Sequence, residues 1–359
     1  MCIPEDYPEH EYDTPEWLRA GSTNGGVKMG AASSESSASE GRLIVERMPI
    51  TYEGYTYPHG HIAYIEGAGP KPVILVHPNY AGLKQFDIDQ CCFLARCGYA
   101  ALCVDHYQES ELYTFEDRNP RRSHHAGTAI PLDLNTDQRT AARRHGVGAF
   151  TCMNDALQHP KHWRGLMRAN LEMAWAHPAV ESGLAGAIGY CFGGQACIEH
   201  VRAGHPLQAV VSFHGLLHSK PLKTNEDGSP NFNAGRISDE EYETKFFDDV
   251  NTYDTDCKVL IENGDLDDEV PQSDIDKFKD EMDAHGVDWR FNNHAQTPHG
   301  FALAAGVWST AYHEAADRRS TLSMLSLFAE VWPQYPQNYV AANACGTVLG
   351  QAILTGAKL

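Results

Sequence analysis

A six-residue motif near the middle of the chain, Gly189-Tyr190-Cys191-Phe192-Gly193-Gly194, restricts the possible folds more than any other segment. An apolar, strand-like run over residues 184–188 leads directly into it, and a helix-like segment to about residue 202 follows it. A Gly-x-Cys-x-Gly sequence in that position predicts a sharp turn from a strand into a helix, where side chains in place of the glycines would collide. Cys191 then lies at a helix N-terminus, where the helix dipole favours a thiolate. Cys191 is therefore a candidate nucleophile, and the backbone N–H of Phe192 is a candidate oxyanion donor.

Strand-like and helix-like runs alternate from residue 43 onward, and this alternation predicts an α/β fold. Short, continuous apolar runs indicate strands that are covered on both faces. We therefore expect a mostly parallel central sheet with helices on both faces. The expected strands cover residues 72–76, 99–104, 184–190, 209–213, 259–261 and 287–292, and the expected helices cover residues 86–97, 161–176, 192–202, 273–285 and 308–331.

The chain divides into three parts by composition. Residues 1–42 form an acidic, Gly- and Ser-rich extension, which cannot bury enough apolar surface to offset its ordering entropy. Residues 43–332 form the expected α/β domain, and residues 333–359 form a C-terminal tail. Within the domain, the polar segments 109–148 and 220–252 interrupt the alternation. We interpret both as loop insertions, which are either solvated loops or a lid at the mouth of a site.

Charge and hydrophobicity exclude several classes of partner. The chain has 28 Lys and Arg against 48 Asp and Glu, a formal net charge of −20. Such a surface repels nucleic-acid phosphates and anionic membranes, so we expect neither as a partner. No segment approaches the roughly 20 apolar residues of a membrane span, and the N-terminus lacks the features of a signal peptide. We therefore expect a cytoplasmic protein with reduced cysteines.

No residues suggest a structural metal. The ten cysteines show no repeated Cys-x-x-Cys spacing, and we expect Cys91, Cys92, Cys97 and Cys103 to pack in the core. His59-x-His61 has the spacing of a metal pair, but we interpret it as an exposed strand edge. We expect no metal and no organic cofactor.

A base and an acid for Cys191 follow it in the chain. An acid-rich loop over residues 263–271 comes after one expected strand, and His299 comes after the last one. Functional side chains gather at the carboxyl ends of the strands in open α/β sheets. Nucleophile, acid and histidine also appear in the chain order that this kind of strand-to-helix turn requires.

Together these motifs resemble the dienelactone hydrolase family, over roughly residues 43 to 332. The Gly-x-Cys-x-Gly-Gly motif lies around Cys191, and the two further family motifs fall on Gly264, Asp267, Val270 and Pro271 and on His299, Gly300 and Phe301. The resemblance implies an α/β-hydrolase fold and a triad of Cys191, Asp267 and His299. It also implies hydrolysis of a small-molecule ester or lactone by a monomer or homodimer, through a thioester acyl-enzyme.

The resemblance extends to the residues around the triad. It implies that the backbone N–H of Tyr80 is the second oxyanion donor, and it makes Asn79, His77 and Tyr190 candidates for the pocket. Two positions depart from the family: Asn79 replaces a Glu that interacts with the resting thiol, and Leu303 replaces an Arg that binds a substrate carboxylate. An arginine from the 118–144 segment is a possible substitute.

Other functions remain open on the sequence alone. A catalytically silent α/β-hydrolase that binds a ligand or a partner keeps the fold, and a redox-sensing protein keeps the reactive thiol. Cys191 as a small buried cysteine is the simplest alternative. Chain order disfavours a papain-like protease, in which the Cys lies near the N-terminus. The last residues, Ala357-Lys358-Leu359, are a variant of the peroxisomal address, which would apply in a eukaryote.

Overall fold

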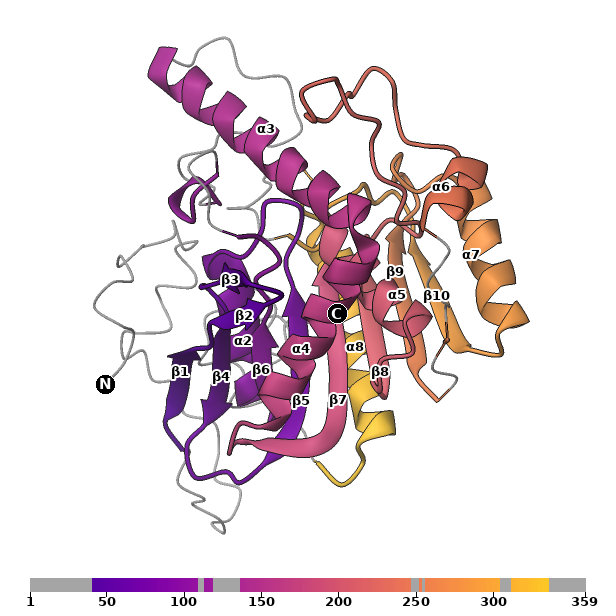
Figure 1. Ribbon diagram of the computed structural model, residues 1–359. Helices are drawn as coiled ribbons and strands as arrows, with labels where there is room; N and C mark the ends of the chain where they lie inside the picture. The colour runs from indigo at the N-terminus through magenta and orange to yellow at the C-terminus, as the bar shows by residue number, and fades with distance from the viewer. Residues whose placement is uncertain are drawn as a thin grey trace.

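A central sheet organises the protein. A computed structural model describes residues 41–108, 113–118, 136–246, 252–253, 256–303 and 311–335. Within these ranges an eight-stranded sheet has the order β1-β4-β6-β5-β7-β8-β9-β10 (Figure 1). Its strands are β1 (Leu43–Arg47), β4 (His61–Ile65), β5 (Lys71–His77), β6 (Ala100–Cys103), β7 (Val180–Tyr190), β8 (Ala209–Phe213), β9 (Lys258–Gly264) and β10 (Asp288–His294). A separate hairpin consists of β2 (Ile50–Tyr52) and β3 (Tyr55–Tyr57).

The sheet is mostly parallel, as the sequence predicts. Strands β6, β5, β7, β8, β9 and β10 pair in parallel, while β1 and β4 pair antiparallel at one edge. In β5, Val73 and Leu75 pack against one helix layer, and Ile74 and Val76 pack against the other. Side chains of a strand alternate between its two faces, so a strand that is apolar throughout must be covered on both.

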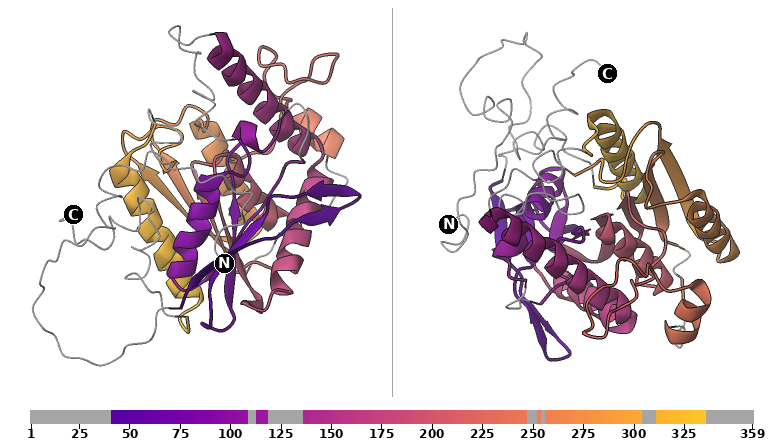
Figure 2. Two further views of the ribbon diagram at one scale, coloured as in Figure 1. Left: turned by 90° about the vertical axis from the view of Figure 1, so that its left-hand side faces the viewer. Right: turned by 90° about the horizontal axis from the view of Figure 1, so that it is seen from above.

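Helices cover both faces, which confirms the second half of the prediction. Helices α2 and α8 pack on one face, and α4, α5 and α7 pack on the other. Figure 2 shows the sheet between these two layers. The helices are α2 (Gln85–Arg96), α3 (Thr136–Gln158), α4 (Pro160–Trp175), α5 (Phe192–Arg202), α6 (Asp239–Phe246), α7 (Gln272–Ala284) and α8 (Glu314–Val331), with a short 3-10 helix at Glu116–Arg118.

The structure corrects four expectations. The second part of the 109–148 segment is not a loop but the start of α3, which runs across the upper edge of the sheet in Figure 1. Helix α8 begins at Glu314, capped by His313, and residues 311–313 before it are not helical, while the expected start at residue 308 lies outside the described residues. Helix α7 begins at Gln272, with Pro271 as its cap residue, and not at residue 273. His61 is buried on β4 between two neighbouring strands, so it does not lie on an exposed edge.

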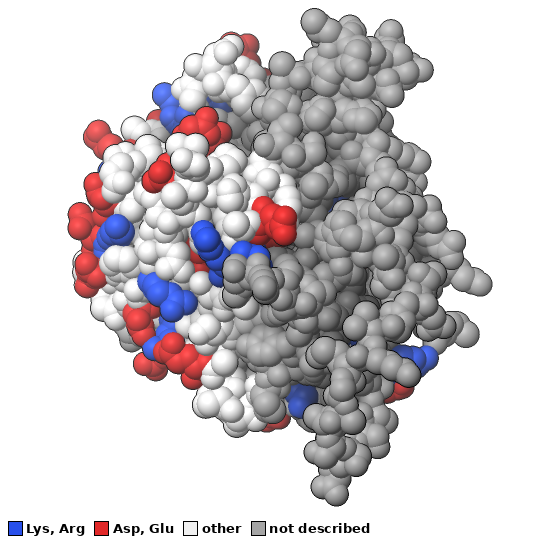
Figure 3. All heavy atoms as spheres, turned by 180° about the vertical axis from the view of Figure 1, so that it is seen from behind, with Lys and Arg blue, Asp and Glu red and all other residues white. Residues whose placement is uncertain are grey.

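The expected extension, most of the expected tail and the terminal tripeptide lie outside the described residues. Among those that are described, no helix combines the length and the apolar character that crossing a membrane requires. On the described part of the face in Figure 3, acidic and basic side chains are interspersed. That part of the surface shows no basic stripe of the kind that follows a nucleic-acid backbone.

Candidate active site

The turn around Cys191 has the strained geometry that the motif predicts. Cys191 caps α5 with φ 55° and ψ −113°, in the left-handed region that non-glycine residues rarely occupy. A Cβ on Gly189 would lie 2.0 Å from the carbonyl oxygen of Gly193, and a Cβ on Gly193 would lie 2.0 Å from that of His77. Both positions therefore require glycine. Cys191 itself is 8% exposed.

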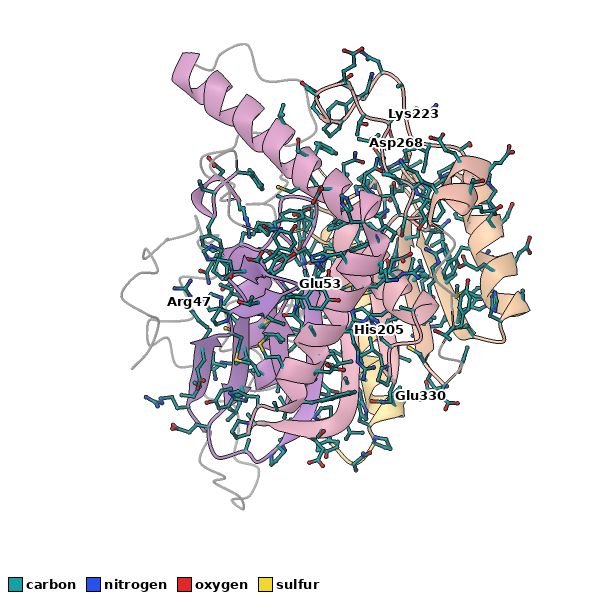
Figure 4. All side chains as sticks on the ribbon, viewed as in Figure 1. Arg47, Glu53, His205, Lys223, Asp268 and Glu330 are labelled. Atoms are coloured by element: carbon teal, nitrogen blue, oxygen red, sulfur yellow. The ribbon has the colours of Figure 1, made fainter. Side chains whose placement is uncertain are left out.

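Asp267 and His299 come together beside this turn. Asp267 follows β9 and His299 follows β10, and His299 Nδ1 lies 2.9 Å from Asp267 Oδ2. The N–H of Leu266 donates to the carbonyl of Thr297 at 2.9 Å, which ties the two loops together. Figure 4 labels the neighbouring Asp268 near the upper end of the sheet, whereas Glu330 lies near the lower end of α8. The pair therefore lies where the carboxyl ends of the parallel strands meet.

The electrostatics of His299 connect all three side chains. Burial by itself lowers the pKa of His299, but the charge of Cys191 and the hydrogen bonds to Asp267 and Cys191 raise that pKa well above its usual value. Asp267 accepts at both oxygens, from His299 and from the N–H of Glu269 at 3.0 Å. The imidazole is thus held in one orientation with its Nε2 left for Cys191 and a reacting group.

Two backbone N–H groups are available at the turn. Among the described residues, neither the N–H of Phe192 nor that of Tyr80 has a hydrogen-bond acceptor. The loop that carries Tyr80 packs directly against Gly193 through the carbonyls of His77 and Pro78. The Tyr107 hydroxyl holds it by donating to the carbonyl of Tyr80 at 2.9 Å. The N–H groups of Phe192 and Tyr80 are therefore both available as candidate oxyanion donors.

The three pocket candidates have partners inside the protein. Asn79 Oδ1 accepts from the N–H of Ala81 at 3.1 Å and from Lys84 Nζ at 3.0 Å. The Tyr190 hydroxyl donates to Gln90 at 3.2 Å, and its ring stacks on Phe213 in the core. His77 is fully buried, with both ring nitrogens bonded to other histidines. The structure therefore does not bring these three side chains to the triad.

His77 belongs to a chain of four buried histidines. The Trp163 indole donates to His106, and hydrogen bonds then join His106 to His77, His77 to His200, and His200 to His205, at 2.7 to 3.0 Å. An indole N–H only donates, so it fixes the tautomer of each neutral ring in turn. Burial lowers the pKa of His106 to about 3 and that of His205 to about 4. The chain is therefore neutral near pH 7 and links β5 to the nucleophile helix α5.

The structure adds residues that the sequence did not indicate. Arg236 donates to the carbonyl of Lys220 at 2.7 Å, and burial lowers its pKa against the charges of Glu269, Cys191 and Asp274. Arg236 is therefore a positively charged side chain that interacts with the charges of Glu269 and Cys191. Arg118 is instead fully buried in an ion pair with Asp105 at 2.7 Å, so it is not the substitute arginine. The arginines at 121 and 122 and the side chains of those at 139, 143 and 144 lie outside the described residues.

Helix α3 and the loop over residues 220–238 form a rim beside Tyr80. Asn154 of α3 bonds both backbone groups of Leu222, which anchors the loop to the helix. Phe150 stacks on Tyr80 at 4.7 Å between ring centroids and meets Phe232 edge-on at 5.1 Å. The sequence did not predict this rim, because the segment that contains the start of α3 is polar and rich in arginine and therefore resembles a loop.

His214 lies on the inner side of the triad. It is fully buried, and its ring lies 5.1 Å from the ring of His299. Neither of its ring nitrogens has a hydrogen-bond partner among the described residues. Its φ of 40° is also in the left-handed region. The only sequence signal was its position just after an expected strand.

A separate cavity of about 380 Å³ lies between α4, α6 and α7. Arg202, at the far end of α5 from Cys191, lines it, and a helix of that length spans roughly 16 Å. Its charges pair with one another, as in Arg202 with Glu281 and Lys220 with Asp239. In the described part of the chain, no group of three or more His, Cys, Asp or Glu side chains is arranged to hold a metal ion.

Comparisons with known proteins agree with this geometry. Residues 59–332 match the model of the dienelactone hydrolase family. An uncharacterised protein from Caenorhabditis elegans is 26% identical over 174 residues, which cover 46% of this chain and 92% of that protein. A dienelactone hydrolase-like promiscuous phosphotriesterase from metagenomic libraries is 26% identical with a TM-score of 0.55, covering 81% of this chain and 99% of that one.

A candidate dienelactone hydrolase from Klebsiella pneumoniae shares the fold, with a TM-score of 0.55 at 19% identity, over 80% of this chain and 99% of that one. The family expected from the motifs is therefore confirmed, and so is the α/β-hydrolase fold. The family model covers most of the sheet, the turn at Cys191 and the loops that carry Asp267 and His299. The chain therefore belongs to the dienelactone hydrolase family.

Proposed function

We propose that this protein hydrolyses a carboxylic ester or a lactone through a triad of Cys191, Asp267 and His299. The observation that carries the proposal is the position of His299, which bonds Asp267 at 2.9 Å and contacts Cys191 at the N-terminus of α5. Family membership supports a hydrolase, and the site supports a cysteine as its nucleophile.

The steps follow from the groups present. Cys191 Sγ attacks the carbonyl carbon, and the electron pair of the carbonyl moves onto its oxygen, between the N–H groups of Phe192 and Tyr80. His299 Nε2 gives a proton to the leaving alcohol oxygen as the tetrahedral intermediate collapses to a thioester. The same nitrogen then takes a proton from water, whose oxygen attacks the thioester carbon; the C–S bond breaks, the acid is released, and the thiolate of Cys191 is restored beside protonated His299. Asp267 stabilises the positive charge of His299 throughout.

The leaving group defines the substrate class. A thiolate is a better leaving group than an amine, so an amide intermediate would expel the sulfur and return to substrate. We therefore propose esters, lactones or thioesters rather than peptides. The small-molecule character of the substrate agrees with the largely buried nucleophile.

The test is hydrolysis of p-nitrophenyl acetate and butyrate by the wild type and by Cys191→Ala and His299→Ala. We expect activity in the wild type and its loss in both variants, with Cys152→Ala as a matched control. Cys152 lies on α3 in a partly buried position and has no role in the scheme. Undiminished activity in Cys191→Ala would exclude the mechanism.

A silent, ligand-binding member of the fold is the second candidate. Asn79 favours it, because this amide is engaged by Ala81 and Lys84 and cannot accept the thiol proton. Alkylation by iodoacetamide separates the two. If Cys191 reacts no faster than a thiol in a short peptide and no ester is cleaved, the binding function is favoured.

A further inference from the structure

We propose that the side-chain hydroxyl of Tyr80 donates a hydrogen bond to the reacting substrate, in addition to the backbone N–H of the same residue. Tyr80 would then be a catalytic residue. The inference rests on the proposed ester or lactone hydrolysis at Cys191.

The hydroxyl of Tyr80 is a buried donor without an acceptor. Tyr80 is 4% exposed, and its hydroxyl has no hydrogen-bond partner in the described part of the chain. Its buried neighbours differ: the Tyr107 hydroxyl donates to the carbonyl of Tyr80 and the Tyr113 hydroxyl donates to that of Ala81, at 2.9 and 2.8 Å. Burial without a partner destabilises a fold, and such groups in native proteins call for a functional reason.

The position of the ring explains which partner the hydroxyl lacks. Tyr80 belongs to the same buried cluster as Cys191 and Phe192, and its loop packs on the nucleophile turn at Gly193. Burial raises the pKa of the Tyr80 hydroxyl, and the charge of Cys191 raises that pKa further. The hydroxyl therefore stays protonated at every pH at which the enzyme would work, and it remains a donor.

The ring is held rigidly, as a catalytic donor should be. One face stacks on Phe150 of α3, with ring planes 28° apart, and Phe150 in turn meets Phe232 of the 220–238 loop. At the other end, Tyr107 fixes the backbone of Tyr80. A donor that is oriented before the reaction stabilises developing charge without the cost of reorganisation.

The chemistry needs such a donor when Cys191 attacks. A bond forms between Sγ and the carbonyl carbon, and the π electron pair becomes a full negative charge on oxygen. The Tyr80 hydroxyl shares its hydrogen with a substrate oxygen but does not transfer it, because its pKa is raised. The proton for the leaving oxygen still comes from His299, so the atom balance of the proposed reaction is unchanged.

The test is Tyr80→Phe, which removes one oxygen and leaves the ring stack and the backbone N–H in place. We expect kcat for p-nitrophenyl butyrate to fall about 10- to 100-fold with little change in KM, because the donor acts on charge that develops in the transition state. We also expect the melting temperature to stay the same or rise, since the variant loses an unsatisfied buried group. A purely structural hydroxyl would lower it.

Two controls make the outcome decisive. Tyr57→Phe removes a buried hydroxyl that bonds His162 at 2.7 Å, in the hairpin strand β3, and it should leave kcat unchanged. Alkylation of Cys191 by iodoacetamide should proceed at the wild-type rate in Tyr80→Phe, because the hydroxyl does not bond the resting sulfur. Equal kcat in Tyr80→Phe and an active wild type would overturn the inference alone, whereas an inactive wild type would overturn the proposed hydrolase and this inference with it.

Discussion

A buried ion pair beneath the Tyr80 loop offers a quantitative test of how that loop is held. Lys84 Nζ lies 3.0 Å from Asp87 Oδ2, with side-chain exposures of 3% and 0%. The ammonium also donates to Asn79 Oδ1 at 3.0 Å and to the carbonyl of Gly82 at 3.2 Å. Its three hydrogens therefore have three acceptors, two of them in the loop beside Cys191.

Replacing Lys84 with Met should leave a charge without its partner. Burial raises the pKa of Asp87 and the ammonium of Lys84 opposes that rise, so the carboxylate depends on Lys84 to stay ionised. Removing one member of a buried pair costs about 3–5 kcal/mol of unfolding free energy, equivalent to a fall in melting temperature of roughly 5–15 °C. Thermal and urea unfolding followed by circular dichroism would measure it.

The double variant Lys84→Met/Asp87→Leu is the matched control. Because it removes both charges, it should recover most of the lost stability, while the Tyr80 loop still lacks its anchor and ester hydrolysis stays slow. A loss below about 1 kcal/mol in Lys84→Met would refute this reasoning, as would a double variant no more stable than the single one.

The same pair explains the departure at Asn79. Asp87 already neutralises the charge of Lys84, so the neutral amide of Asn79 accepts a hydrogen bond from the ammonium without adding a second negative charge. A glutamate there, which the resemblance to the family leads one to expect, would place two carboxylates around one ammonium in a buried site. An amide at position 79 is therefore compatible with the buried pair of Lys84 and Asp87.

Three further predictions concern titration and specificity. Cys191→Ala removes the largest influence that raises the pKa of His299, so the imidazole of the variant should titrate at a lower pH when followed by NMR. In the wild type, the contribution of protonated His299 to the free energy of unfolding is complete below pH about 6.5 and is lost as the pH rises through the raised pKa. Burial lowers the pKa of His205 to about 4, so this residue makes the fold less stable as the pH falls from about 6.5 toward 4. In urea titrations, His205→Asn should therefore reduce the loss of unfolding free energy between pH 6 and 5 by up to about 1.4 kcal/mol. Arg236→Gln should lower kcat/KM about 10-fold for an ester that carries a carboxylate and leave a neutral ester unaffected, and equal effects on both would exclude an anion-binding role.

The central sheet was predictable because its signal is local. Strands such as β5 are buried on both faces and read as continuous apolar runs, which the sequence shows without knowledge of the neighbours. The strands β1 and β4 were not among the expected strands, since their place in the sheet depends on antiparallel pairing with each other and with β6. Helix α3 was missed for a related reason. Its buried residues Ala149 and Met153 have helical spacing, but the residues before them are polar, and packing on the nucleophile side decides the structure.

In the candidate site, too, local signals were predictable and tertiary contacts were not. The positions of Cys191, Asp267 and His299 follow from motifs that are each tied to the end of a strand, so local sequence and topology are sufficient to bring them together. Hydrogen-bond partners depend on tertiary contacts, which no local motif encodes. His77 therefore looked like a pocket residue but joins a buried histidine chain, and Arg236 looked like part of a solvated loop but interacts with the charges of Glu269 and Cys191.

Unsatisfied buried polar groups and strained backbone lie at the end of β8, next to Cys191. The N–H of Cys191 donates to the carbonyl of Phe213 at 3.0 Å, and the residues on either side of Phe213 are both unsatisfied within the described chain. Ser212 Oγ lacks a partner where Gly194 packs closest, and His214 lacks partners at both ring nitrogens and has a left-handed backbone. Together with the strained φ of Cys191 and the hydroxyl of Tyr80, which has no partner among the described residues, these features destabilise the structure around the Cys191 turn. Strain of this kind persists only where the surrounding structure is stable enough to impose it, and here the six parallel strands provide that stability. The unsatisfied groups of Ser212, His214 and Tyr80 lie outside the Gly-x-Cys-x-Gly motif, so they support the proposed site at Cys191 and His299 separately from that motif.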